Sequence, residues 1–280
     1  MPSAFACVDL VKEFYTDSVR QEWRRLVKDP VRRLELDTTL HFLAPYLPAD
    51  GAILDAGGGP GRYTIELARR GYAMTLLDMT PANLDFAQRQ IKRAKVQQQV
   101  RAIVEGSIVD LSRFADASFD AALCLGGPLS HVLEAEDRVR AVGELLRVVK
   151  PGGVAAVSVM GRLSVLALEL DLFPEEIDNS LHAQIRDSGS YYGGSGFTPC
   201  HFFLPEELVA LFDGGTARVE ELVGLEGLTS RLYKAAIRAA RHPERWRRWL
   251  ETHYQTCTHP AVVGLSEHIL IIVRKEEHIT

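Results

Sequence analysis

ILDAGGGPGRY, residues 53–63, places four glycines and one proline directly behind a short apolar run and Asp55. Residues 52–56 are typical of a short buried strand, and residues 61–71 have the spacing of a helix closed by Gly71. Glycine allows a sharp turn and the close approach of a ligand, and a helix N-terminus directs N–H groups toward it. Strand, glycine turn and helix in this order predict a site for a nucleotide-like cofactor.

Alternation of strands and helices continues beyond this turn. The pattern predicts strands at 73–78, 99–106, 119–127 and 152–161, helices at 80–95 and 134–150, and two later strands at 217–227 and 266–275. Two further helical patterns, residues 8–28 and 31–47, come before the first strand. The fold class is therefore α/β, with a doubly wound seven-stranded sheet that is mostly parallel and has helices on both faces.

Composition narrows the class of protein. The 280 residues are 46% hydrophobic and 25% charged, with a net charge of −5, which is ordinary globular usage and disfavours nucleic acid as a partner. No apolar stretch approaches the roughly 20 residues of a membrane span, and the N-terminal residues lack the pattern of a signal peptide. Four scattered cysteines, without a CxxC pair, fit reduced thiols. These features predict a cytoplasmic protein with no membrane partner, and they leave its oligomeric state open.

The spacing of the glycines distinguishes among the known nucleotide- and cofactor-binding motifs. The NAD fingerprint needs a third glycine where this chain has Arg62, and no Gly-Lys-Ser/Thr follows for a P-loop. The observed spacing is D-x-G-x-G-x-G, from Asp55 through Gly57 and Gly59 to Gly61. It resembles the first motif of class I S-adenosylmethionine-dependent methyltransferases. Residues 114–133 and 144–159 are similar to later segments of that family, so the resemblance covers residues 50–160 well.

The resemblance implies that the site binds S-adenosylmethionine, which methyl transfer would convert to S-adenosylhomocysteine. Asp78 would hold the ribose, and Met79 would lie against the adenine. Ser107 stands where the family often has aspartate, and Ser107 with the Ile108 N–H would serve the adenine. Leu125 and Gly126 would flank the methionine portion. The cofactor-binding residues expected are Asp55, Gly57, Gly59, Gly61, Asp78, Met79, Ser107, Ile108, Leu125 and Gly126. Structural alternatives are a helix cap at Asp78 and a loop serine at Ser107.

The family's antiparallel last strand also predicts where an acceptor would bind. The chain divides into N-terminal helices (1–48), the cofactor-binding core (49–160), a lid insertion (161–204) and the rest of the core (205–280), with a helical insertion at about 227–264. The N-terminal helices and both insertions would meet at the carboxyl edge of the parallel strands. We expect them to form a helical lid over a small-molecule acceptor.

Candidate acceptor-side residues follow from that edge. His131, after the fourth strand, is the expected general base, and His201 in the lid is the second candidate. Substrate contacts are expected from Tyr15, Tyr191, Tyr192 and His268. The structural alternatives are a backbone-bonded histidine at His131, packing within the lid for His201, Tyr191 and Tyr192, and burial on the apolar face of its helix for Tyr15. Only one of Glu267 and His268 faces the pocket if the last strand alternates. The acceptor atom stays open among oxygen, nitrogen, carbon and sulfur.

Two other functions are compatible with the same cofactor motif. They are an RNA or protein methyltransferase, which a basic stripe on the lid side would favour, and a non-catalytic S-adenosylmethionine-binding regulator. An NAD-dependent oxidoreductase is disfavoured by Arg62. His253, Cys257 and His259 lie close in sequence, but three local ligands without a partner pair do not predict a metal site. The arginines near 241–248 are expected to form a solvated face with Glu244 and Glu251 as counter-charges.

Overall fold

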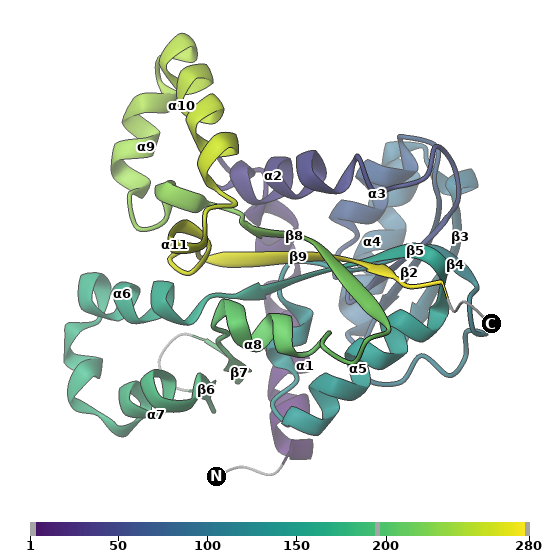
Figure 1. Cartoon of the computed structure of the whole chain (residues 1–280), viewed down its shortest axis with the longest axis horizontal. Coiled ribbons are helices and arrows are strands. Elements are labelled where there is room, and N and C mark those ends of the chain that lie inside the picture. The colour runs from purple at the N-terminus through teal and green to yellow at the C-terminus, as the bar shows by residue number, and fades with distance from the viewer. Residues whose placement is uncertain (1–3, 194–196, 278–280) are drawn as a thin grey trace.

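The computed structural model describes residues 4–193 and 197–277. Its centre is a seven-stranded sheet with the order β3-β2-β1-β4-β5-β9-β8 (Figure 1). Its strands are β1 (Ala52–Ala56), β2 (Ala73–Asp78), β3 (Val100–Glu105), β4 (Phe119–Cys124), β5 (Val149–Met160), β8 (Ala217–Gly224) and β9 (His268–Lys275). Strands β1 to β5 pair in parallel, and β9 is antiparallel to both β5 and β8. The predicted fold class and the antiparallel last strand are confirmed.

Helices cover both faces of this sheet, because apolar residues of the strands alternate between them. Ile53 and Leu76 face one core, while their neighbours Leu54 and Leu77 face the other. The first core is completed by α2 (Arg33–Leu43), α3 (Arg62–Ala68) and α4 (Pro81–Ala94). The second is completed by α5 (Ala135–Val148) and α8 (Pro205–Ala210). Strands buried on both faces explain the continuous apolar runs in the sequence. Two short 3-10 turns, η1 (Gln97–Gln99) and η2 (Pro128–His131), precede β3 and follow β4.

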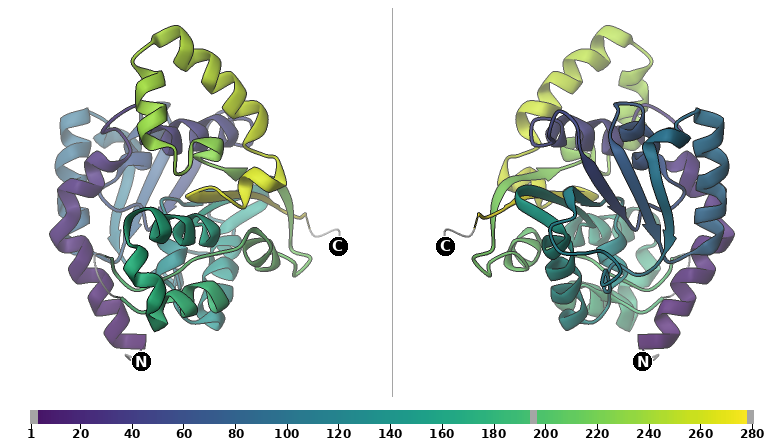
Figure 2. Two further views of the ribbon diagram at one scale, coloured as in Figure 1. Left: turned by 90° about the vertical axis from the view of Figure 1, so that its left-hand side faces the viewer. Right: turned by 90° about the vertical axis from the view of Figure 1, so that its right-hand side faces the viewer.

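The long helix α1 (Ala4–Arg25) runs past the edge of the sheet and packs beside α4 (Figure 2). Trp23 joins the two helices, because its ring lies 5.8 Å from that of Phe86. The apolar spacing of residues 8–28 predicted this helix, which ends three residues earlier, at Arg25. Within the described residues, no helix has both the length and the apolarity to cross a membrane.

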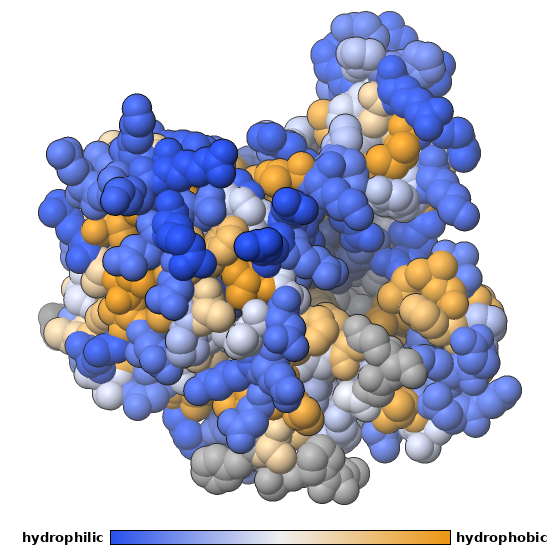
Figure 3. All heavy atoms as spheres, turned by 180° about the vertical axis from the view of Figure 1, so that it is seen from behind, coloured by the Kyte–Doolittle hydropathy of each residue, from blue (hydrophilic) through white to orange (hydrophobic). Residues whose placement is uncertain are grey.

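Two lobes extend from the sheet between its later strands. The first holds α6 (Arg162–Leu172), η3 (Pro174–Asp178), α7 (Ser180–Ser188), β6 (Ser190–Tyr191) and β7 (Cys200–His201). Its own apolar cluster contains Ile185, Tyr191, Cys200 and Phe202. The second holds η4 (Gly227–Thr229), α9 (Tyr233–Ala240), α10 (Pro243–Thr256) and α11 (Pro260–Val263). Helices α9 and α10 form a hairpin that projects from the molecule, and the surface is hollowed between the two lobes (Figures 1 and 3).

The glycine turn between β1 and α3 has positive φ angles, which residues with a Cβ atom rarely adopt. Gly57, Gly59 and Gly61 have φ angles of +76°, +55° and +83°. A Cβ added at Gly57 would lie 2.6 Å from the ring of Pro128, whereas one added at Gly59 would meet nothing closer than 3.8 Å. Both positions carry backbone strain, but only Gly57 carries a steric clash as well.

We therefore expect Gly57→Ala to reduce the free energy of unfolding more than Gly59→Ala does. Gly59→Ala should cost about 1–2 kcal/mol from its left-handed backbone, and Gly57→Ala more than that because Pro128 must also move. Urea unfolding followed by circular dichroism measures both values. Equal losses in the two variants would show that the contact with Pro128 is not a constraint.

Candidate active site

The glycine turn is fastened to the end of β2 by its own backbone. The N–H groups of Gly57 and Gly58 both donate to the Leu77 carbonyl, at 2.7 and 3.1 Å, and Gly61 N–H donates to Gly58. Gly59 N–H donates to Asp78 Oδ2 at 2.8 Å. All four glycine N–H groups are therefore occupied within the protein. The glycines supply a flat surface that a ligand can approach closely.

Asp78 lies at the centre of this arrangement. Its Oδ1 accepts hydrogen bonds from Thr80 N–H at 2.9 Å and from Asn83 Nδ2 at 3.2 Å, in addition to the Gly59 bond on Oδ2. Burial raises the pKa of Asp78, and these hydrogen bonds oppose that rise. The carboxylate is 7% exposed and lines a cavity. Asp78 is thus both an anchor for the turn and an acceptor that faces the cavity.

Asn83, which the sequence did not single out, adds a second acceptor. Its Nδ2 is held by Asp78, while its buried Oδ1 has no hydrogen-bond partner and the residue lines the same cavity. A buried acceptor without a partner is costly, so it marks a place where a ligand donor would bind. A hydroxyl-bearing ribose fits this pair of acceptors. The only sequence signal was the position of Asn83 in the first turn after Thr80-Pro81.

The cavity has a volume of about 310 Å³ and extends along the carboxyl edge of the parallel strands. That size is within the usual range for ligand sites, about 300–1,000 Å³. Of the residues predicted to bind the cofactor, those that line it are Gly57, Gly59, Asp78, Met79, Ser107, Ile108, Leu125 and Gly126. Asp55 and Gly61 do not. Asp55 is fully buried behind the turn, where it accepts a hydrogen bond of 2.5 Å from Thr64 Oγ1, and burial raises its pKa to about 6.

Helix α1 forms the opposite wall of the cavity. Glu22 and Arg25 line it from the C-terminal half of the helix, and Arg25 Nε donates to Glu22 at 3.0 Å. Neither residue could be singled out from the sequence, because a single arginine or glutamate in a helix carries no local signal that distinguishes a cavity-lining side chain from a solvent-exposed one. A cation and an anion side by side suit a zwitterionic ligand end such as that of methionine.

Tyr15 and His131 meet at this wall, although 116 residues separate them. Tyr15 Oη lies 2.7 Å from His131 Nε2, and His131 Nδ1 lies 2.9 Å from the carbonyl oxygen of Pro199. Burial lowers the pKa of His131 to about 4 and raises that of Tyr15. Both residues line the cavity, in the positions that the sequence assigned to the acceptor side.

The other acceptor-side candidates lie elsewhere. His201 is buried, with its Nε2 3.6 Å from Glu207 and its ring against Phe203. Tyr191 is buried in the apolar cluster of the first lobe, and neither it nor Tyr192 lines the cavity. None of the described residues of 161–204 or 227–264 lines the cavity, so of the three predicted lid segments only the N-terminal one, through α1, forms its wall. The first lobe contacts the cavity wall only indirectly, through Phe197 and Pro199, which contact His131.

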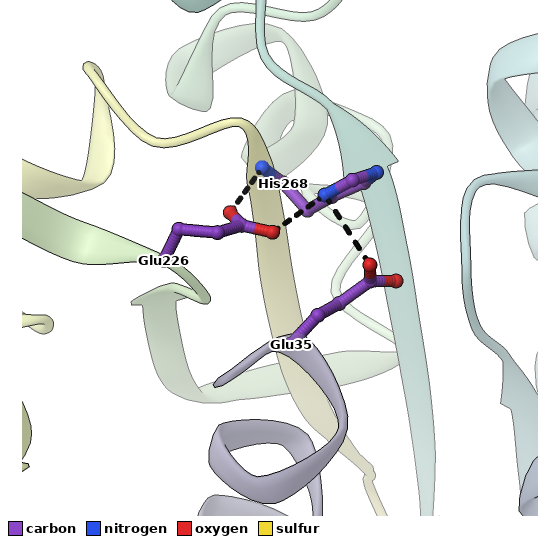
Figure 4. A group of neighbouring side chains, drawn as sticks. All are labelled: Glu35, Glu226 and His268. Carbon is purple, nitrogen blue, oxygen red and sulfur yellow. Dashed lines mark hydrogen bonds and ion pairs between the residues drawn. The ribbon is translucent and has the colours of Figure 1, made fainter. Parts of the chain in front are cut away.

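His268 takes part in a buried charge cluster instead of contacting the cavity. Its Nδ1 lies 2.8 Å from Glu226 Oε1 and 3.7 Å from Glu35 Oε2 (Figure 4). Glu35 also binds the guanidinium of Arg25, with Nη2 3.2 Å from Oε1. Burial alone would lower the pKa of His268, but Glu35 and Glu226 raise it to about 9. Arg25 and His268 thus share the carboxylates of Glu35 and Glu226, and Arg25 also binds Glu22.

This cluster is also the one group of His, Cys, Asp and Glu ligand atoms among the described residues that is close enough for a metal ion. Both of its carboxylates are already paired with cationic side chains, Glu35 with Arg25 and Glu226 with His268. The residues weighed as metal ligands from the sequence do not converge within the part of the chain that the structure describes. His253 Nε2 bonds Thr38 at 2.8 Å, and His259 Nδ1 accepts from Ala261 N–H at 3.2 Å.

Comparisons with known proteins agree with this geometry. Residues 53–153 match a protein family described as a methyltransferase domain. A ubiquinone biosynthesis O-methyltransferase from Xanthomonas axonopodis pv. citri is 33% identical over 178 residues, which is 64% of this chain and 67% of that protein. A glycine/sarcosine N-methyltransferase from Parasynechococcus marenigrum is 27% identical over 155 residues, 55% of this chain and 53% of that protein. This chain thus spans about half the length of several of its curated relatives.

Solved structures share the fold. A SAM-dependent methyltransferase from Methanosarcina mazei has a TM-score of 0.59 at 22% identity, over 84% of this chain and 97% of that one. The 1,6-didemethyltoxoflavin-N1-methyltransferase of Burkholderia thailandensis, bound to S-adenosylhomocysteine, has a TM-score of 0.57 at 16% identity, over 99% of this chain and 92% of that one. The chain belongs to the class I S-adenosylmethionine-dependent methyltransferases. S-adenosylmethionine is the cofactor of that family.

The charge cluster predicts a pH dependence of stability. Because the folded pKa of His268, about 9, is above its ordinary value of 6.5, its stabilising effect is complete below pH 6.5 and lost as the pH rises through 9. We expect the free energy of unfolding to fall by roughly 1–3 kcal/mol over that interval.

Urea unfolding of the native chain and of His268→Gln at pH 6 and pH 9.5 measures this contribution. The variant should lose less stability than the native chain between the two pH values. His182→Gln is the matched control, because it removes another histidine that pairs with a glutamate, Glu169, within the first lobe. An identical pH dependence in the native chain and His268→Gln would contradict the proposed charge balance.

Proposed function

We propose that this chain transfers a methyl group from S-adenosylmethionine to a small-molecule acceptor bound beneath α1. The observation that carries the proposal is one cavity that joins the glycine turn and Asp78 to Tyr15 and His131. The cofactor supplies an electrophilic methyl group on a sulfonium. Asp78 and Asn83 would hold its ribose, Met79 and Ile108 would border its adenine, and Arg25 with Glu22 would bind its methionine end.

Relatives support an acceptor of small size. The names of the similar proteins refer to ubiquinone biosynthesis, to glycine and sarcosine, and to a toxoflavin precursor, all of them small molecules. The wall opposite the strand ends is formed by α1, on which Val8 and Val11 give an apolar surface, together with Leu26 just after the helix. An enclosed, partly apolar site positions a small acceptor and excludes water, and positioning supplies much of the rate of such transfers. A separate regulatory role without catalysis would not need Tyr15 and His131 at this wall.

A second candidate function, methylation of RNA or protein, is favoured by one observation. Residues 233–256 carry six Lys or Arg and two Glu, against a net charge of −5 for the whole chain. The sequence analysis expected Glu244 and Glu251 to neutralise this face. In the structure both bind the same arginine, Arg247. The remaining cations of the hairpin have no carboxylate partner among the described residues: Lys234, Arg238, Arg241, Arg245 and Arg248.

Cofactor binding is the first test of the primary proposal. Asp78→Ala should weaken binding of S-adenosylhomocysteine by about 1–3 kcal/mol, the usual loss for a charge-assisted hydrogen bond. Asn83→Ala should weaken it less, because it removes one neutral acceptor and leaves the Gly59 bond intact. Calorimetric titration measures both, with NADH as the alternative ligand. Asp85→Ala, an exposed aspartate on the same helix, is the matched control. Tight binding of NADH and none of S-adenosylhomocysteine would refute the proposal.

The basic hairpin separates the two candidate functions. We expect a single-stranded oligouridine RNA to show no binding at about 0.15 M salt, since the rest of the chain is acidic and phosphate contacts weaken steeply with salt. Fluorescence anisotropy measures this for the native chain and for a variant with Lys234, Arg238 and Arg245 all replaced by Gln. RNA binding that the native chain shows and the variant loses would favour the macromolecular acceptor.

A further inference from the structure

The contact between Tyr15 and His131 fixes where both protons lie. The Pro199 carbonyl can only accept a hydrogen bond, so His131 Nδ1, 2.9 Å away, must carry the imidazole proton. Nε2 of the neutral ring is then an acceptor. The Tyr15 hydroxyl, 2.7 Å from it, must donate. One backbone carbonyl in the first lobe thus sets the direction of a chain of hydrogen bonds that ends in the cavity.

The surroundings keep both groups neutral. Burial holds the pKa of His131 at about 4, and it raises the pKa of the Tyr15 phenol. The charges that act on Tyr15 are Glu22 and Arg25 on its own helix and Asp78 on β2, with the Cys200 thiol on β7. The rings packed against the pair are apolar, namely Phe14 on Tyr15 and Phe197 on His131. No carboxylate bonds His131 among the described residues, unlike His268.

His131 is therefore not free to contact an acceptor itself, because its lone pair is taken by Tyr15. Tyr15 in turn donates its only hydroxyl proton to His131, so its oxygen can only accept hydrogen bonds from a ligand in the cavity. We propose that the methyl acceptor is an N–H or O–H nucleophile whose proton bonds Tyr15 Oη, and that Tyr15 relays this proton to His131 Nε2. This inference rests on the proposed methyl transfer and specifies its acceptor class.

The lone pair of the acceptor nitrogen or oxygen forms the new bond to carbon, and the electron pair of the broken carbon–sulfur bond stays on sulfur. The acceptor atom, now positive, releases its proton to Tyr15 Oη while the phenolic proton of Tyr15 moves to His131 Nε2. Tyr15 stays neutral throughout, and His131 becomes an imidazolium that later returns its proton to water through the same path.

The low basicity of His131 sets the order of events. A base with a pKa of about 4 does not remove a proton from a neutral N–H or O–H group, but it accepts one from a methylated cation that is a stronger acid than its own imidazolium. The acceptor must consequently be nucleophilic while still protonated. Hydroxyl groups, weakly basic N–H heterocycles and aryl amines meet both conditions, whereas alkylamines do not, because an alkylammonium ion with a pKa of about 10 keeps its proton. Tertiary amines and thioethers have no proton to offer Tyr15.

The direction of the hydrogen bonds is tested on the protein alone, without turnover. Nitrogen NMR of ¹⁵N-histidine-labelled protein identifies the tautomer of His131, whose signals are assigned with His131→Asn. We expect a protonated Nδ1 and an unprotonated Nε2 at pH 7. Tyr15→Phe should raise the pKa of His131 by about one unit, because the bond that stabilises the neutral ring is lost. Tyr191→Phe, which removes a buried hydroxyl outside the cavity, should leave it unchanged. The opposite tautomer, or no response to Tyr15→Phe, would overturn the relay.

The acceptor class is tested with two probes that differ by one proton, phenol and its methyl ether anisole. Each is titrated into the S-adenosylhomocysteine complex while the His131 signals are followed. Phenol should shift the Nε2 signal several-fold more than anisole does, and Tyr15→Phe should abolish the difference. Equal effects of the two probes, including none from either, would overturn the proposal. Calorimetry of S-adenosylhomocysteine is read separately, so loss of the proposed function is distinguished from loss of the relay.

Discussion

The site depends on the attachment of the glycine turn to the end of β2. Two N–H groups on one carbonyl and a third on the Asp78 carboxylate hold β1, β2 and the start of α3 in one arrangement. The same carboxylate fixes Thr80 and Asn83 at the start of α4. A short acidic side chain at this position therefore organises the floor of the cavity before any ligand binds. Such prior organisation reduces the cost of binding.

The fold was largely predictable from the sequence because its signals are local. Strands such as 52–56 and 73–78 are mostly apolar, Gly71 ends a helix, and Pro81 begins one, so each boundary is marked by the residues beside it. The side of the cavity at the strand ends followed from topology and from the family resemblance, since parallel strands bring their carboxyl ends to one edge. The short strands β6 and β7, at two residues each, carry no periodic signal and were not predicted.

Partnerships across long stretches of chain were not predictable in this way. Asn83 and Arg25 became candidates only when the structure showed an acceptor without a partner and a charge beside the cavity. The lid prediction failed in part for a similar reason. Topology brings residues 161–204 to the right edge, but their apolar side chains form a cluster of their own and reach the cavity only through Pro199 and Phe197. His131 and His268 show the same limit, because burial without a carboxylate lowers one pKa while two carboxylates raise the other.

The cluster of Arg25, Glu35, Glu226 and His268 has a consequence for how this protein can change over time. Its four charged side chains come from α1, α2, the segment after β8 and the start of β9, and both of its glutamates are buried. Replacing one member leaves a buried charge without compensation, which typically costs about 3–5 kcal/mol, whereas exchanging the whole set for apolar residues can cost nothing. Substitution of one of these residues alone is therefore selected against, whereas simultaneous substitution of all four is tolerated. Across descendants of this sequence, the four residues should persist or disappear as a group.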